Sequence, residues 1–397
     1  MGIRMRHPRP KSLCKLCLIL GMTAWLWIPP GSQSQSPRRA PRETFDPLPD
    51  WRPTHVPANA RYLGNEACAQ CHDQATTQPA TPMGRALEPV AARRLLAERP
   101  PLTFKEGPFS YSIARRGEES VYTVTDGKDS LSLPIRYAFG LGKLAQTYVF
   151  LHAGKFYEGR VSYFRRLGGL DLTPGASREA PASLAAALGR ELSSEIVNDC
   201  FGCHATAAVS QGQLQLEGMT PGITCEGCHG PGERHVAAIK ARGAAPGPAE
   251  RQIFNPGRFD TEGLTQFCGA CHRSWIQVQM MGIRGVENVR FQPYRIFNSK
   301  CYDHQDKRIS CTACHNPHEE LAADAAFYDA KCLACHETAR RPPGPGGKAL
   351  AGKAPACPKG RQNCASCHMP KTELPEMHHQ FTDHQIRVVR PGDPYPN

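Results

Sequence analysis

Hydrophobic and polar residues alternate over most of residues 109–164, which is the period-two pattern of half-buried β-strands. The alternating runs are Phe109–Ile113, Ser120–Val124, Thr147–Leu151 and Lys155–Gly159, the last continuing to Phe164. Turn signals separate them at Arg116-Gly117, Asp126-Gly127 and Ala153-Gly154. The pattern predicts a small antiparallel β module within residues 101–170.

A second pattern follows the β module. The Ala-, Leu- and Glu-rich run from Ser177 to Val197 has the spacing of an amphipathic helix, with Ser177 as the candidate N-cap. We therefore expect a helix over residues 177–199. Outside these regions strongly periodic segments are few, and Gly and Pro contribute 36 residues each, well above their usual ~12% combined share. The remainder predicts loops and short helices.

The N-terminal pattern is that of a secretory signal. A basic stretch containing Arg4 and Lys15 precedes the apolar run Leu16–Ile28 and the small-residue zone Gly31–Ser34. These 13 apolar residues fall short of the ~20 that span a bilayer. We expect residues 1–35 to be removed on export to the periplasm or beyond, leaving no integral membrane segment. A retained N-terminal anchor is the alternative.

Seven times the chain carries Cys, two residues, Cys and His. Numbered 1 to 7 in chain order, these motifs are Cys68, Cys71 and His72; Cys200, Cys203 and His204; Cys225, Cys228 and His229; Cys268, Cys271 and His272; Cys311, Cys314 and His315; Cys332, Cys335 and His336; and Cys364, Cys367 and His368. One helical turn of this kind presents two thiols to the vinyl groups of haem and places the His under the iron. A single copy is also half of a zinc site, but seven complete copies predict seven covalently attached haem c groups.

The motifs change how the charge is understood. The formal net charge is +12, which by itself suggests an anionic partner. Five of those cations lie in the predicted signal, and the haem propionates bring the holoprotein to about zero with ferric iron. No run of Lys and Arg with interleaved aromatics lies outside the signal. We therefore exclude nucleic acid and expect redox proteins as electron donors and acceptors.

Function depends on the second axial ligand, because an iron closed by two His passes electrons whereas an open one binds substrate. Beyond the motifs and the signal the chain has eight histidines, enough to close all seven irons: His55, His152, His235, His304, His318, His378, His379 and His384. His235 and His318 are the strongest candidates. They follow a motif His by six and three residues, too few to reach the opposite face of the same iron, so we expect them to ligate neighbouring haems. The candidate set is completed by His384, His304, His55, His152 and one of His378 and His379, of which we take His378.

Cys301 and Cys357 lie outside both the motifs and the signal. In an oxidising compartment a disulfide between them is the preferred interpretation. Free thiols and sulfur ligation of an iron are the alternatives.

Motif spacing predicts the organisation of the chain. We expect a signal at 1–35, a Pro-rich approach with haem 1 at 36–100, the β module at 101–170, a helix and haem 2–6 core at 171–339, and a linker with a haem 7 arm at 340–397. The fold class is then a mainly α and irregular multihaem cytochrome, with short helices and loops wrapped round a haem array and a small inserted antiparallel β module. The module is either a scaffold that covers the haems or a docking surface.

Four segments resemble the periplasmic multihaem c-type cytochromes of the cytochrome c-552/c-554-like, doubled CXXCH class: Tyr62–Cys68, Ile223–Gly232, Cys301–His318 and Cys364–Lys371 with Phe381–His384. The resemblance implies a compact haem array that carries electrons, and it supports His235, His318 and His384 as distal ligands. Pentahaem nitrite reductase and octahaem hydroxylamine oxidoreductase are similar in haem packing. The chain departs from both, since it has seven motifs and no Cys-X-X-Cys-Lys site.

These observations favour an exported heptahaem electron carrier with mainly bis-His haems. The alternative is a multihaem oxidoreductase that acts on a small nitrogen or sulfur species at one open-face haem, so an enzymatic role stays undecided. A repeating unit of a conductive filament is a third hypothesis.

Overall fold

The structure is a computed structural model that describes residues 59, 61–88, 94–242, 252–304, 306–336 and 357–396. The predicted signal, His55 and residues 340–356 of the predicted linker lie outside this part. Within it, helices and strands both occur, and no helix combines the length and apolar character needed to cross a membrane.

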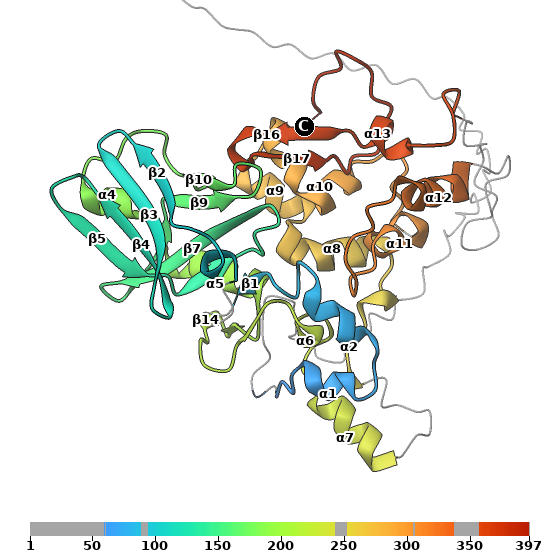
Figure 1. The fold of residues 1–397 in the computed structure, drawn as a ribbon. Coiled ribbons are helices and arrows are strands. Elements are labelled where there is room, and N and C mark those ends of the chain that lie inside the picture. The colour runs from blue at the N-terminus through green and yellow to red at the C-terminus, as the bar shows by residue number, and fades with distance from the viewer. Residues whose placement is uncertain are drawn as a thin grey trace, which may run out of the picture. The chain divides into compact units, whose positions relative to one another are not determined.

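Two antiparallel sheets form the region between the first two motifs (Figure 1). The four-stranded sheet contains β2 (Leu102–Glu106), β3 (Phe109–Arg116), β4 (Glu119–Thr125) and β5 (Ser130–Pro134). The seven-stranded sheet contains β1 (Leu87–Glu88), β6 (Tyr137–Phe139), β7 (Ala145–His152), β8 (Lys155–Gly159), β9 (Val161–Phe164), β10 (Gly169–Leu172) and β11 (Gly189–Glu191). Every alternating run predicted from the sequence is a strand, and additional strands widen the region to residues 87–191.

The two sheets share one apolar core. Strands β3 and β4 bury alternate residues, so Tyr111 and Tyr122 both point inward with at most 1% of their surface exposed. The ring of Tyr122 contacts that of Phe150 from β7, with centroids 5.1 Å apart. Val161 and Tyr163 of β9 belong to the same cluster. This part of the chain therefore has an ordinary packed core of its own.

The predicted single helix over residues 177–199 is wrong. The chain instead forms α4 (Leu184–Leu188) and α5 (Ser194–His204), with β11 between them. Gly189 causes the break: its φ is +145°, and a Cβ there would lie 2.1 Å from the Glu158 carbonyl oxygen of β8. Only glycine allows this close antiparallel approach.

The predicted cap is also wrong. The Ser177 hydroxyl accepts from the nearby Glu179 N–H rather than from a helix end. Ser183 and Ser193 are the caps, and they accept from the third residues of α4 and α5. Their side chains fix where each short helix begins.

Short helices and hairpins make up the rest of the described chain. The α-helices are α1 (Asn65–Ala69), α2 (Gln74–Thr77), α3 (Arg94–Ala97), α6 (Cys225–His229), α7 (Glu233–Arg242), α8 (Thr261–His272), α9 (Trp275–Met281), α10 (Gln292–Phe297), α11 (Cys311–Cys314), α12 (Ala325–His336) and α13 (Cys364–His368). The 3₁₀ helices are η1 (Gln78–Ala80), η4 (Pro256–Arg258), η5 (Gly285–Arg290), η6 (Lys307–Ile309) and η7 (Pro375–Met377). The small hairpins pair β12 (Ala205–Thr206) with β15 (Thr220–Pro221), β13 (Val209–Ser210) with β14 (Gln213–Leu214) and β16 (Lys371–Leu374) with β17 (His379–Thr382).

The motif-rich part of the described chain has little apolar packing. Its buried cluster consists of Val278, Phe291 and Tyr294, with Trp275 and Ile283 against it. Phe201 of motif 2 belongs to a second buried cluster shared with the β region, and Phe254, Phe259 and Phe267 pack together near motif 4. These clusters are small for a segment that carries six motifs. This is the packing expected where a large cofactor supplies the interior.

Gly222 holds the approach to motif 3 against the segment that follows motif 1. Its φ is +81°, and a Cβ there would lie 1.9 Å from the Gly84 carbonyl oxygen. We expect Gly222→Ala to lower the stability of the holoprotein by about 1–3 kcal/mol more than Gly218→Ala, because backbone has to move. Gly218 is a matched control, with φ +84° and nothing within 4 Å of its Cβ. Equal urea midpoints for the two variants would contradict the prediction that the Gly84 carbonyl oxygen excludes a Cβ at position 222.

Candidate haem centres

Each motif begins in a helix, which places its two cysteines on one face. The helices that carry motifs 1 to 7 are, in order, α1, α5, α6, α8, α11, α12 and α13. Motif 1 leaves its helix early, but its turn continues because the His72 N–H donates to the Cys68 carbonyl at 3.0 Å. The local geometry needed for two-point attachment is therefore built into all seven segments.

Three motif histidines face a second imidazole. The ring centroids of His72 and His235 lie 6.3 Å apart. Those of His229 and His318 lie 6.1 Å apart with an interplanar angle of 10°, and His384 lies 6.2 Å from the ring of motif 5. Two imidazoles bound on opposite sides of one metal, through bonds of about 2 Å each, have centroids about 6 Å apart. The residues present thus fit an iron between each pair.

Hydrogen bonds hold several motif and distal histidine rings in the tautomer that binds metal. The Nδ1 atom of His204 donates to the Ala86 carbonyl at 2.9 Å, and that of His229 donates to Phe254 at 2.8 Å. The His384 Nδ1 donates to its neighbouring Thr382 carbonyl at 3.0 Å. A proton fixed on Nδ1 leaves the Nε2 lone pair for a metal.

Burial also keeps these histidines neutral. Desolvation lowers the pKa of His229 and of His315 below the usual value. It lowers the pKa of His384 to about 4. A neutral imidazole is the form that ligates a metal, so near pH 7 these side chains need not lose a proton first.

Motifs that are distant in sequence meet through their thiols. Four motif cysteines have a thiol of another motif beside them that acts on their pKa: Cys225 acts on Cys68, Cys271 on Cys203, Cys311 on Cys268, and Cys364 on Cys332. Cys314 lies close enough to Cys332 for the charge of one thiolate to act on the other. Motifs 1 and 3, 2 and 4, 4 and 5, 5 and 6, and 6 and 7 are therefore neighbours.

The other described distal candidates lie elsewhere. His304 is over half exposed, and its Nδ1 is 3.3 Å from the Glu262 carboxylate. The Nε2 of His378 is 2.7 Å from the Asp171 carboxylate. His152 packs against Tyr157 of β8, at 5.9 Å between ring centroids. None of the three is paired with a motif histidine among the described residues.

The preferred Cys301–Cys357 disulfide is absent, because both residues are free thiols. Cys301 is half-buried beside Cys332 and Cys335 of motif 6, where burial raises its pKa. Cys357 is exposed. The physical reason is position: Cys301 faces the thiols of motif 6 instead of the C-terminal segment.

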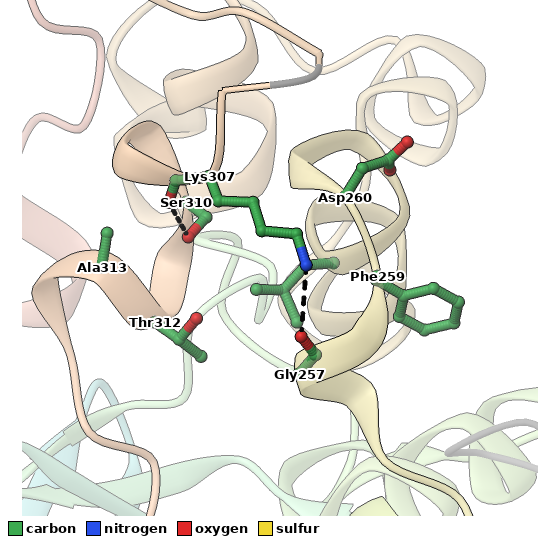
Figure 2. A pocket seen from close by; sticks show the side chains of 8 residues that line it. Gly257, Phe259, Asp260, Lys307, Ser310, Thr312 and Ala313 are labelled. Atoms are coloured by element: carbon green, nitrogen blue, oxygen red, sulfur yellow. Dashed lines mark hydrogen bonds between the residues drawn. The ribbon is translucent and has the colours of Figure 1, made fainter. Parts of the chain in front are cut away.

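A pocket of about 230 Å³ borders motif 5 (Figure 2). Its lining comes from η4, α8, η6 and α11 and consists of Gly257, Phe259, Asp260, Leu264, Lys307, Ser310, Thr312 and Ala313. The Lys307 ammonium donates to the Gly257 carbonyl at 3.5 Å. No predicted iron ligand lines this pocket.

Two buried carboxylates escaped the sequence analysis. Glu226 lies between the two cysteines of motif 3 and is 2% exposed. Asp329, three residues before motif 6, accepts from the Asn363 and Cys364 N–H groups at 2.7 and 2.8 Å. The sequence shows only that an acidic residue lies in or near each of these motifs. Such a residue could equally be exposed to solvent, so the sequence does not predict its burial.

Comparison with known proteins agrees with this chemistry. A family model described as cytochrome c554 and c-prime matches residues 175–230, a segment that carries motifs 2 and 3. No curated protein and no solved structure matches the chain. The family match supports a c-type cytochrome with covalently bound haem c.

Proposed function

We propose that this protein is an exported heptahaem c-type cytochrome that carries electrons through closely packed, mainly bis-His haems. The observation that carries the proposal is the set of three imidazole pairs, at 6.1–6.3 Å between centroids. Each pair joins a motif histidine to a histidine from another part of the chain. His235 would ligate haem 1, His318 haem 3 and His384 haem 5.

Neighbouring motifs support continuous passage of electrons. Neighbouring thiols connect motif pairs 1 and 3, 2 and 4, 4 and 5, 5 and 6, and 6 and 7. His318 also follows motif 5 by three residues while its ring faces that of motif 3. Every motif therefore has at least one other motif beside it, as a chain of electron carriers requires.

When bound, haem c supplies a reversible one-electron change at iron. The protein residues have three tasks around it. The motif cysteines would hold the porphyrin covalently, and the three histidine pairs would bind iron from two sides, which would exclude substrate there. Backbone carbonyls such as those of Ala86 and Phe254 hold the rings in the ligating tautomer.

One observation favours the second candidate, an oxidoreductase for a small nitrogen or sulfur species. In the described part of the chain, His204, His272, His336 and His368 face no second imidazole at the distance of the three pairs. An iron at one of them with an open distal face would accept a small ligand. We rank this function below electron transfer because three of the motif histidines face a second imidazole at the distance that two ligands of one iron require.

The test is to count haems and spin states in the exported protein. We expect an intact mass with seven attached haems and an electron paramagnetic resonance (EPR) spectrum dominated by low-spin ferric signals. Cyanide should leave the spectrum unchanged on the timescale of mixing. A mass with fewer haems would overturn the heptahaem assignment, and rapid cyanide binding at one iron would establish the oxidoreductase alternative.

A further inference from the structure

Glu226 is a buried carboxylate that joins three separate haem-binding segments. Its Oε2 accepts from the Gly64 N–H at 2.8 Å, and both carboxylate oxygens accept from the Leu63 N–H at 3.0–3.1 Å. These donors lie at the start of α1, the motif 1 helix. Its Oε1 also accepts from the Gly232 N–H at 2.7 Å. Gly232 opens the turn into α7, the helix that carries His235.

The contact between motifs 1 and 3 is reciprocal. While Glu226 from α6 accepts from the start of α1, the Asn65 side chain of α1 accepts from the Cys225 N–H of α6 at 3.2 Å. Each helix therefore satisfies backbone donors at the other's N-terminal end. The Cys68 and Cys225 thiols meet at the same place.

No described cation forms an ion pair with Glu226, although the side chain is 2% exposed. Within the described part of the chain, backbone N–H groups of Leu63, Gly64 and Gly232 hold this carboxylate. The pKa of the Cys68 thiol is raised chiefly by the nearby Cys225 thiol and by burial. The charge of Glu226 raises it further. A buried charge without a counterion is felt at longer range than one in water.

We propose that Glu226 is a positioning residue for the haem 1 and haem 3 pair: its side chain fixes motif 1 and the His235 helix to motif 3 and places a carboxylate beside both motifs. This inference rests on the proposed electron-transfer function. It adds a determinant of haem geometry and of reduction potential that neither the motifs nor their ligands contain. A fixed negative charge favours the ferric state, so it lowers the potentials of the nearest haems.

Asp329 repeats the arrangement at motifs 6 and 7. It comes from α12, the helix of motif 6, and its carboxylate accepts from the two N–H groups that open α13, the helix of motif 7. Here too the thiols of the two motifs, Cys332 and Cys364, meet beside the carboxylate. Glu226 and Asp329 therefore each connect two motif helices through backbone donors.

Two variants separate geometry from charge. Glu226→Gln keeps the reach of the side chain but loses the charge, and Glu226→Asp keeps the charge but loses the reach. We expect Glu226→Gln to raise the midpoint potential of one or two haems in spectroelectrochemical titration of the holoprotein. We expect Glu226→Asp to shift the EPR g-values of a low-spin signal, because the His235 ring turns, with a smaller change in potential.

Glu66→Gln is the matched control. Glu66 lies on the same α1 helix and is exposed, so water screens its charge. The proposal is overturned if Glu226→Gln shifts no potential beyond the control and Glu226→Asp leaves all g-values unchanged. If Glu226→Gln fails to assemble, the Asp variant decides by its g-values. Failure of the proposed function is distinguishable, since it would appear in the wild-type haem count and low-spin spectrum.

Discussion

His384→Ala should convert one iron from low spin to high spin while all seven proposed haems stay attached. His384 pairs with the ring of His315 at 6.2 Å, and it has no part in thioether attachment. Removing one of two imidazoles leaves iron five-coordinate or water-ligated, which weakens the ligand field. Relative to the wild type, EPR should show a gain of high-spin ferric signal equivalent to one iron, and cyanide should then bind at that iron.

His304→Ala and His378→Ala are the controls for this experiment. Both were candidate ligands from the sequence, but Glu262 and Asp171 hold their rings away from the motif histidines. We expect both variants to keep the wild-type spin count. A high-spin signal in either control, or its absence in His384→Ala, would contradict the assignment of haem 5.

Arg295→Leu should be among the most destabilising single substitutions in the described chain, at about 3–5 kcal/mol. The Arg295 guanidinium and the Asp383 carboxylate have no exposed side-chain surface and form a two-point ion pair at 2.8–2.9 Å. The guanidinium also donates to Asn288 at 3.0 Å and to the Pro396 carbonyl at 2.9 Å. Leucine leaves these acceptors and a buried carboxylate without their main donor. Urea unfolding of the holoprotein measures the loss.

The pH dependence of this variant has a definite sign. In the wild type, burial acts to raise the pKa of Asp383, but hydrogen bonds and charge from Arg295 and Arg387 outweigh it and lower the pKa. A depressed pKa contributes stability above the unfolded-state pKa of about 3.9. That contribution is lost as the pH falls through the lower folded-state value. In Arg295→Leu the pKa rises, so the stability gap between variant and wild type should narrow in acid.

Two comparisons isolate the buried pair. Arg295→Met with Asp383→Asn removes both charges, and we expect it to recover most of the loss. Arg136→Met removes one partner of an ion pair with Glu119 whose side chains are about half exposed, and it should cost at most about 1 kcal/mol. A loss in Arg295→Leu no larger than that of Arg136→Met would show that the buried pair contributes little.

Sequence patterns predicted the chemistry and the strands because both depend on local spacing. The motif spacing brings two thiols and one imidazole together within one helical turn, and alternation placed β3, β4, β7 and β8. The long helix after Ser177 failed for a non-local reason. A glycine is required at position 189 because the Glu158 backbone of another strand approaches closely. The periodicity of residues 177–199 contains no information about this distant contact.

The pairing of distal histidines needed the three-dimensional structure for the same reason. Sequence spacing showed only that His235 and His318 are too near their own motifs to close the same iron. Which rings face them, His72 and His229, follows from packing between distant segments. The role of Glu226 could not be predicted from the sequence for a further reason. It depends on backbone N–H groups of Leu63 and Gly64, and the pattern of side chains does not show where backbone donors lie.

The contacts of motif 5 determine the topology of the proposed circuit. Cys311 meets Cys268 of motif 4, Cys314 lies by Cys332 of motif 6, and His318 faces His229 of motif 3. In the proposed circuit, haem 5 would therefore have three neighbours rather than two. The Cys268 thiol of motif 4 also lies close enough to Cys228 of motif 3 for the charge of one to act on the other. Haems 3, 4 and 5 would then form a closed triangle, so electrons could pass between haems 1 and 2 by more than one route, whereas haem 7 would be reached through haem 6.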